Sequence, residues 1–362
     1  MSLYASFQNR DFTARTQPAL DMRVQSYSHS AIGGPRQAVI PVSGGEEELW
    51  SLLNMIRCPV EICTDKTEPA WWGYVQRVDL SLKKYTISVD ITEMANSVKV
   101  AYGNGLQTSF LSDTDSVDEF GTKEVILSLG NISVRWANQY RQNYLNSHRY
   151  PLTNVQLSGV DEPSGTINCA GWWSTLDWRY ADIPSGSAVD TSSQIQTIIT
   201  TYGDYLQGSS LYGTARTNFV RTDSGITSNP YQDGNSTCRA VIDQICETGT
   251  TNAYRMLPTV TPGRVVEIKV EPSYTSTNNV CVLRSGGELL TPYGEYIRPE
   301  LCKVGTWASV ADIIPSTVDV SRLSDLPYFF IEESEYDAIY KSVRYTPRGI
   351  SNLWQLTSPR HG

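Results

Sequence analysis

The fold is decided by the stretch WWGYVQRVDL, residues 71–80. Its aromatic and β-branched residues are typical of a strand, and comparable short stretches surround it with turn residues between them. This pattern predicts a mainly β protein with a few helices (α+β), built around an antiparallel barrel or sandwich. The other strands expected in the first half are 36–42, 59–63, 84–91, 98–102 and 124–129.

Helical spacing first interrupts the strands at Ser43-Gly44-Gly45-Glu46, which has the S-x-x-E spacing of a capping box. The apolar residues that follow recur at helical spacing and are expected to lie on the sheet. They are Leu49, Leu52, Leu53 and Ile56. A second helix is expected over residues 133–149, before Tyr150-Pro151 stops it, and can join two domains. It carries Trp136, Tyr140, Tyr144 and Leu145 on one side.

The second half shows the same kind of succession of helices and strands, without repeating the residues of the first half. After a strand expected at 171–180, Asp190 can cap a helix, and Asn235 or Ser236 can cap another that Gly249 ends. Strands then follow at 253–257, 264–270 and 280–283. The inward residues of the two helices are Ile195, Ile198, Ile199, Tyr202 and Leu206, then Cys238, Val241, Ile242 and Ile245.

A helix followed by several strands therefore occurs twice, near residues 46–102 and near 235–290. We expect two tube-like β-barrel domains, each with a packed helix, and a smaller domain between them. Polar arms at both ends are expected to fold on assembly. The expected divisions are an N-terminal arm at 1–20, a first β-barrel at 21–132, a middle helix and strand domain at 133–234, a second β-barrel-like domain at 235–342 and a C-terminal arm at 343–362.

The chain of 362 residues is acidic, with 29 Lys and Arg against 38 Asp and Glu and a net charge of −9. This balance argues against a protein that grips a nucleic-acid backbone through broad positive charge. No apolar run approaches the roughly 20 residues of a membrane-spanning helix, and no signal-peptide pattern is seen, which predicts synthesis in a cytoplasm. The seven cysteines are odd in number and widely spaced, which predicts reduced, buried thiols.

Few side chains point to catalysis. His29, His148 and His361 have no evident catalytic partner, and Cys58 and Cys63 lack a second pair at zinc-ligand spacing. The common nucleotide-binding, zinc-protease and hydrolase motifs are absent. We therefore predict no enzyme and no cofactor, and we assign no catalytic, cofactor-binding or metal-binding residue.

Two sets of carboxylates leave alternatives open. One is a dense run of the kind that hard cations prefer, although a solvated turn is the favoured interpretation. The other can supply the pair of a polysaccharide hydrolase, although nothing in the sequence selects the pair. The first set is Asp113, Asp115, Asp118 and Glu119, and the second is Asp177, Asp182 and Asp190.

The clusters of tryptophan allow a further alternative, because planar side chains can stack on sugar rings. Since neighbours on a strand face opposite sides, one of each pair is expected in the core and the other at a subunit or domain contact. The alternative function is a carbohydrate-binding β-sandwich adhesin that attaches to host surface glycans. Its stacking platforms would be Trp71, Trp72, Trp172 or Trp173.

Several blocks of the sequence resemble the tail hub, or baseplate hub, proteins of tailed bacteriophages. The resemblance extends over about residues 21–315. In the first half it is carried by residues 32–38 (IGGPRQA), 48–62 (ELWSLLNMIRCPVEI) and 71–75 (WWGYV). In the second half it is carried by residues 194–199, 233–237, 242–249 and 264–272.

The resemblance implies a homotrimer whose barrels form a pseudo-sixfold ring, connecting the tail tube to the tail tip of the virion and lining the DNA channel. The implied partners are tail tube and distal tail proteins, tail-tip or fibre proteins and the tape measure protein. DNA would pass without specific binding, which suits an acidic lumen. Under this hypothesis, removing residues 1–20 is expected to weaken assembly while leaving the isolated fold intact.

Overall fold

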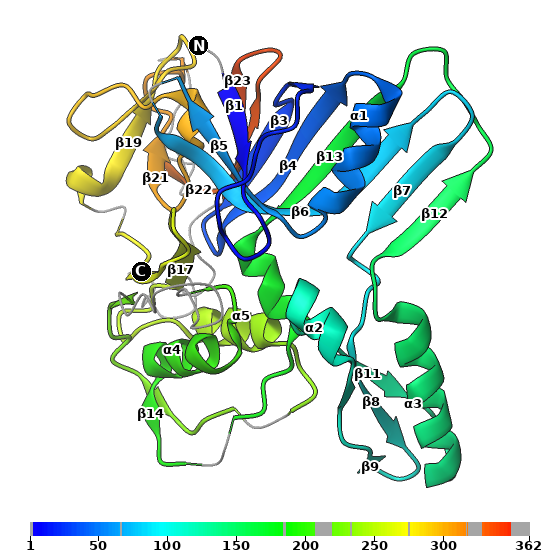
Figure 1. Cartoon of the computed structure of the whole chain (residues 1–362). Coiled ribbons are helices and arrows are strands. Elements are labelled where there is room, and N and C mark those ends of the chain that lie inside the picture. Colours follow the sequence, from blue (N-terminus) through cyan, green and yellow to red (C-terminus); the bar gives the residue numbers. More distant parts are fainter. Residues whose placement is uncertain are drawn as a thin grey trace.

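The computed structural model describes residues 3–65, 67–183, 186–206, 219–231, 234–273, 276–315, 317 and 328–348. Most of the strands belong to one large, curled sheet (Figure 1). In order across this sheet they are β1 (Leu3–Phe7), β5 (Pro59–Thr64), β6 (Pro69–Ser81), β13 (Ser164–Gly171), β4 (Gly34–Ser43), β3 (Ser26–Ser30), β22 (Tyr328–Asp337), β21 (Trp307–Ser309), β19 (Val280–Leu283) and β20 (Leu289–Leu290). Alongside them, β2 (Asp21–Met22) pairs with β4, β7 (Thr86–Asp90) with β6, β12 (Leu152–Gln156) with β7, and β23 (Ser342–Arg348) with β22.

The mainly β prediction is confirmed, but two separate barrels are not seen in the described part of the chain. The two halves join through β3 and β22, where Tyr27 lies opposite Tyr336. This pairing is possible because both tyrosines are buried and their rings pack 5.4 Å apart. Strands from the region expected as a second barrel therefore extend the first sheet.

The predicted strand positions are largely confirmed, and β4, β5, β6, β7, β8 (Ser97–Tyr102), β11 (Glu124–Ser128), β18 (Val266–Val270) and β19 all lie where strands were expected. β17 (Met256–Val260) overlaps the strand expected at 253–257, but its start and its end both lie three residues further toward the C-terminus. The strand expected at 171–180 is wrong, because η2 (Trp172–Trp178) is a 3₁₀ helix. Its hydroxyls explain the change: Ser174 Oγ donates to the Gly171 carbonyl and Thr175 Oγ1 to the Trp172 carbonyl, which stabilises a tight turn.

The first helical passage lies on the sheet as expected, as α1 (Glu46–Trp50) followed by the 3₁₀ helix η1 (Ser51–Met55). Leu49 and Leu52 are fully buried over Gly165 of β13, where a side chain would displace them. The predicted capping box is wrong. Ser43 is the last residue of β4 and pairs with Ser164, so Gly45 becomes the N-cap and no side chain caps the helix.

Two further helices, α4 (Thr191–Tyr202) and α5 (Cys238–Thr248), pack together below the sheet in Figure 1. Asp190 caps α4 as predicted, and Gly249 ends α5 with φ 76°. The N-cap of α5 is Thr237, one residue later than expected. Beside these helices lie β15 (Val220–Arg221), β17 and β18 in one small sheet, and β14 (Val189–Asp190) with β16 (Thr227–Ser228) in another.

A small unit projects from the large sheet at the lower right of Figure 1, and we call residues 96–149 the outer unit. It is inserted between β7 and β12, whose ends are adjacent because Asp90 pairs with Leu152. The domain boundary expected at 132/133 falls inside it, between β11 and α3. Its elements are β8, β9 (Leu106–Gln107), β10 (Leu111–Ser112), α2 (Thr114–Phe120), β11 and α3 (Val134–His148). Because β8 and β11 are parallel and pair with no strand of the large sheet, the antiparallel barrel expected to contain them is wrong.

The side chains grouped on one side of α3 face two directions. Leu145 is buried against the small sheet, whereas Trp136 is 67% exposed. A helix turns about 100° per residue, so nine positions place these two side chains on opposite faces. The aromatic face of α3 therefore points away from the molecule.

The segment expected as an N-terminal arm lies on the chain's own sheet. β1 pairs with β5 along its whole length, and Phe7 is buried in the main core. Because removing residues 1–20 would expose the edge of β5 and empty the Phe7 site, we now expect the deletion to destabilise the isolated fold as well. Of the expected C-terminal arm, residues 343–348 form β23, and residues 349–362 lie outside the described residues.

Candidate functional site

The histidines are placed structurally. His29 is buried in β3, where Nε2 lies 2.9 Å from the Ala70 carbonyl and donates to it, and burial lowers the pKa of the ring to about 4. His148, at the end of α3, stacks on Tyr144 with ring centroids 3.9 Å apart. His361 lies outside the described residues. His148 Nδ1 lies 2.8 Å from the hydroxyl of the adjacent Ser147, which also contacts the Asn143 and Tyr144 carbonyls at the end of α3.

The seven cysteines are all buried and free, as predicted. Within the described ranges, no three His, Cys, Asp or Glu side chains gather as metal ligands would. No helix in the same ranges is both long and apolar enough to cross a membrane.

The carboxylate run at Asp113 is part of a helix and not a cation loop. Asp113 is the N-cap of α2, where its side chain accepts a hydrogen bond from the Ser116 amide at 3.0 Å. It also pairs with Arg149 Nη1 at 2.8 Å, and these contacts lower its pKa. The Asp113 carboxylate is therefore used by the fold.

Two residues of the second set of carboxylates, Asp177 and Asp190, are also in structural use. Asp177 pairs with Arg239 at 3.0 Å, and Asp190 caps α4 by accepting from the Ser192 amide at 2.9 Å. Hydrogen bonds from Ser192 and Ser224 outweigh partial burial and lower the pKa of Asp190 to about 2. The carboxylates of Asp177 and Asp190 are therefore used by the fold.

The tryptophans proposed as sugar platforms lie mainly inside the molecule. Trp71, Trp172 and Trp173 are each less than 5% exposed. Trp72 is half-buried, and its Nε1 donates to the Val260 carbonyl at 3.1 Å. The first pair agrees with the expectation, because Trp71 lies in the core and Trp72 contacts another region of the chain. The second pair is buried on both sides because it lies in η2 and not in a strand.

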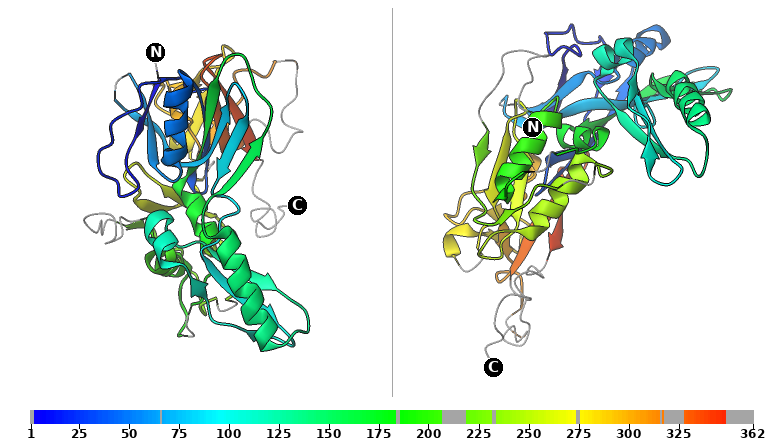
Figure 2. Two further views of the ribbon diagram at one scale, coloured as in Figure 1. Left: turned by 45° about the vertical axis from the view of Figure 1, so that its right-hand side comes forward. Right: turned by 90° about the horizontal axis from the view of Figure 1, so that it is seen from below.

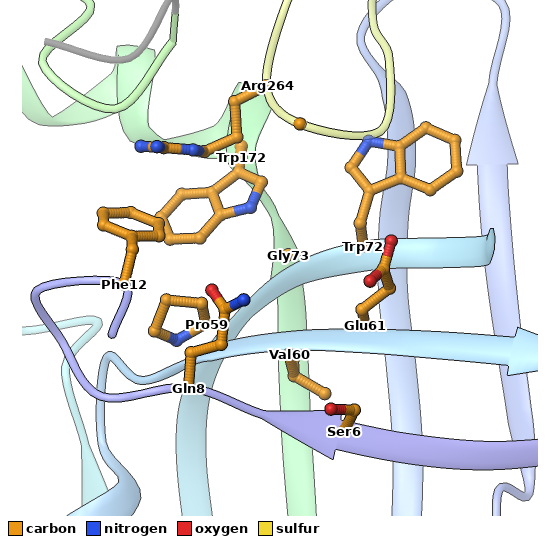
Figure 3. Close-up of a pocket in the computed structure, with 11 residues that line it drawn as sticks. Ser6, Gln8, Phe12, Pro59, Val60, Glu61, Trp72, Gly73, Trp172 and Arg264 are labelled. Atoms are coloured by element: carbon orange, nitrogen blue, oxygen red, sulfur yellow. The ribbon is translucent and has the colours of Figure 1, made fainter. Parts of the chain in front are cut away.

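A pocket between four distant segments is the nearest approach to an enclosed site (Figure 3). It has a volume of about 130 Å³ and lies between the N-terminal segment, β5 with β6, η2 and the turn at Arg264. This volume holds only a few water molecules. Among its described lining residues Glu61 is the single carboxyl, and burial raises its pKa.

Stacked cations and rings close one side of this pocket. The Arg264 guanidinium lies 3.6 Å from the centre of the Phe12 ring, which packs 5.6 Å from Trp172. Arg57 is fully buried, and its guanidinium lies 4.5 Å from the centre of the Tyr205 ring. Cation–π contacts of this kind are stronger away from water. We call this cluster the junction, since it holds residues from four parts of the chain together.

The junction also concentrates backbone strain. Phe12, Arg57 and Arg264 have φ values of 65°, 68° and 69°, a region that side chains other than glycine rarely adopt. Strain of this kind persists only where surrounding contacts hold it. Sequence reasoning missed the junction, because no residue type at these positions signals positive φ.

A second network links the small sheet of β17 and β18 to the far end of the large sheet. Arg255 donates to Glu271 at 3.1 Å and to Glu332 at 2.6 Å, and Arg348 donates to the same two carboxylates at 2.8 and 3.0 Å. A polar cleft of about 440 Å³ lies beside it. Because the network's charges are paired with one another, it acts as a structural clamp.

The base of the outer unit is held by polar contacts. Lys123 Nζ donates to the Ile91 carbonyl at 2.7 Å and lies 5.6 Å from the Trp178 ring centre, and burial lowers its pKa to about 8. The buried Asn96 side chain donates to Gly121 and accepts from the Lys123 amide, each at 2.8 Å. The unit is thus fixed at its base.

The most unusual surface is the outward side of this projecting part. Large apolar side chains are exposed on α3 and along β12, every residue of which is exposed. They come from two adjoining regions, α3 in the outer unit and β12 at the edge of the large sheet, which lies above α3 in Figure 1. They are Val134, Trp136, Tyr140, Tyr150, Leu152, Val155 and Leu157. Exposed apolar surface of this extent is typical of a protein-binding face.

Comparison with known proteins gives a limited result. No protein-family model and no curated protein matches the chain. Its structure is similar to a tail protein from Neisseria meningitidis MC58, with 6% identity and a TM-score of 0.43 over 98% of each chain. It is also similar to the 43 kDa tail protein of prophage MuSo2 from Shewanella oneidensis, with 9% identity and a TM-score of 0.41 over 96% of each chain. Neither likeness is close enough to assign a function to this chain.

Proposed function

We propose that this protein is a structural component of a bacteriophage tail, a hub that forms a homotrimeric ring between the tail tube and the tail tip around the DNA channel. The observation that carries the proposal is the exposed apolar surface of α3 and β12. Trp136 is 67% exposed and Leu157 is 91% exposed. Large apolar side chains exposed in this way are typical of a surface that a partner covers. Such a face fits a protein that functions in an assembly.

Two further features support this role. The sequence resemblance to tail hub proteins covers most of the chain, and the net charge of −9 suits a channel through which DNA passes without binding. The partners would be tail tube and distal tail proteins, tail-tip or fibre proteins and the tape measure protein. The role is mechanical, with no catalytic step, and its site is the virion tail tip.

The carbohydrate-binding alternative keeps only Trp72 of its four proposed residues, since burial leaves Trp71, Trp172 and Trp173 no free ring face. Glycan binding that disappears in a Trp72→Ala variant with an unchanged fold would restore it. No observation favours a hydrolase.

The native mass and low-resolution shape of the purified protein test the proposal. A trimer has three times the chain mass of 40.3 kDa and is expected as a ring with a central hole. A protein that stays monomeric over a wide concentration range, and is also absent from assembled tails, contradicts the hub proposal.

A further inference from the structure

The outward face of α3 combines aromatic side chains with positive charge. Trp136 is 67% and Tyr140 48% exposed, and Arg135 is exposed beside them. The helix contains Arg135 and Arg141 and no carboxylate. Aromatic residues and arginine are the residues most enriched in the energetic centres of protein interfaces. We call these three exposed side chains the α3 face.

A second exposed surface has the complementary character. The turn at residues 291–297, which follows β20, presents Tyr293 at 77% and Tyr296 at 55% exposure, with an exposed Glu295 between them. Glu288 is exposed nearby in the sequence, and residues 285–297 contain no Lys or Arg. We call residues 291–297 the β20 turn.

The β20 turn is held in shape before any partner binds. The Thr291 amide donates to the Glu295 carbonyl at 2.7 Å, and the Gly294 amide donates to the Thr291 carbonyl at 2.9 Å. The Glu295 amide donates to Thr291 Oγ1 at 3.1 Å. Gly294 has φ 85°, which a side chain would strain. A fixed loop loses less conformational entropy on binding, which favours its use as a contact.

The two surfaces lie on opposite sides of the molecule. Figure 1 places α3 at the lower right and β19, the pairing partner of β20, at the upper left, and both views of Figure 2 keep these regions apart. One chain therefore cannot bring its own two surfaces together. Two different patches that bind each other make a head-to-tail contact, and repeating that contact closes a ring if the rotation allows.

We propose that the α3 face of one copy binds the β20 turn of a second copy, with Arg135 opposite Glu295 and the aromatic side chains packed between them. The partner is a second copy of this chain because the two surfaces carry opposite charges, both expose aromatic side chains and lie on opposite sides of one chain. This inference rests on the proposed ring and names its interface.

Charge reversal in the full chain tests the contact, with the concentration for half-maximal assembly measured by sedimentation. Arg135→Glu and Glu295→Arg each place like charges opposite one another, and each is expected to raise that concentration at least about tenfold. The double variant restores opposite charges at every copy of the contact and is expected to recover the wild-type value. Trp136→Ala is expected to raise it at least about tenfold by removing an aromatic anchor.

Arg23→Glu and Tyr340→Ala are matched controls, because Arg23 has an 82% exposed side chain and Tyr340 is 79% exposed, both outside the two surfaces. Neither is expected to change assembly. Wild-type trimers that the single variants leave unchanged overturn this interface but not the ring. Single variants that weaken assembly without recovery in the double variant show that the two surfaces meet other partners, which also overturns it. A wild-type chain that never assembles overturns the ring and the interface together.

Discussion

The large sheet buries Trp71, whereas the outer unit exposes Trp136. Trp71 of β6 is fully buried in a core that runs through α1, η2, α4 and α5. Trp136 of α3 is 67% exposed, and the buried core beneath that helix consists of Ala95, Val98 and Leu145. The outer unit thus has little core of its own and much surface that a partner can cover.

This difference indicates that the large sheet provides the stability of the chain and that the outer unit provides surface for contacts. The large sheet is stabilised from within, by its core, the junction and the clamp of Arg255 with Glu271. The outer unit is tied to the rest of the chain at its base, where Phe120 packs into the main core, Glu124 pairs with Arg179 and Lys123 donates to the Ile91 carbonyl. Trp136 and Tyr140 of α3 stay exposed and can contact a neighbour. Burial by that neighbour would supply stability that its small core lacks.

Replacing one tryptophan in each region tests the comparison with the largest expected effect. Trp71→Ala is expected to lower the free energy of unfolding by about 3–5 kcal/mol, because it leaves a cavity in a packed core. Trp136→Ala is expected to change the stability of the monomer by less than about 0.5 kcal/mol. Denaturant unfolding of both variants measures the contrast. Equal losses would show that the two regions do not differ in this way.

A cavity in the small core should open the outer unit alone. Leu145→Ala is expected to cost about 2–4 kcal/mol, and hydrogen exchange should show lost protection of the amides in β8 and β11 while β6 stays protected. Leu106→Ala is the control in the same unit, because Leu106 is 59% exposed. Loss of protection in β6 as well would show that the two regions unfold as one.

Much of the large sheet could be predicted from local pattern. β5, β6 and β18 lie within two residues of their expected positions, because their β-branched and aromatic residues and flanking turns mark them directly. The buried face of α4 could also be predicted, since Ile195, Ile198 and Ile199 recur at helical spacing, and all three are buried. Local signals of this kind depend only on neighbouring residues.

Contacts between distant segments could not be predicted. The pairing of β22 with β3 depends on a partner about three hundred residues away, and the insertion of the outer unit depends on the pairing of Asp90 with Leu152. The junction was hidden for the same reason. Phe12 becomes part of it only when Arg264 stacks on its ring.

The buried histidine of the large sheet should make the stability of the protein sensitive to acid. Burial lowers the pKa of His29 to about 4, below the ordinary value of 6.5, so the unfolded chain takes up the proton first as pH falls. The stabilisation from neutral His29 is present above about pH 6.5 and is lost between about 6.5 and 4, at about 1.4 kcal/mol per pH unit. His29→Gln is expected to flatten the stability profile over this range, measured by denaturant unfolding at several pH values.

His148 in the outer unit is the matched control for that profile. Because His148→Gln leaves His29 in place, the steep loss of stability between about pH 6.5 and 4 is expected to persist in this variant. A slope that disappears with His148→Gln but persists with His29→Gln would assign the acid sensitivity to the outer unit.

The N-cap of α2 gives the smallest expected effect and separates two contributions within the outer unit. Asp113 accepts from the Ser116 amide at 3.0 Å and pairs with Arg149, which follows α3, at 2.8 Å. Asp113→Ala removes both contacts and is expected to cost about 1 kcal/mol, measured by local hydrogen exchange. Asp113→Asn keeps an oxygen that can cap the helix but loses the ion pair, which is partly exposed, so about 0.5 kcal/mol is expected. If the asparagine variant loses as much as the alanine variant, the pairing with Arg149 stabilises the outer unit more than the helix cap does.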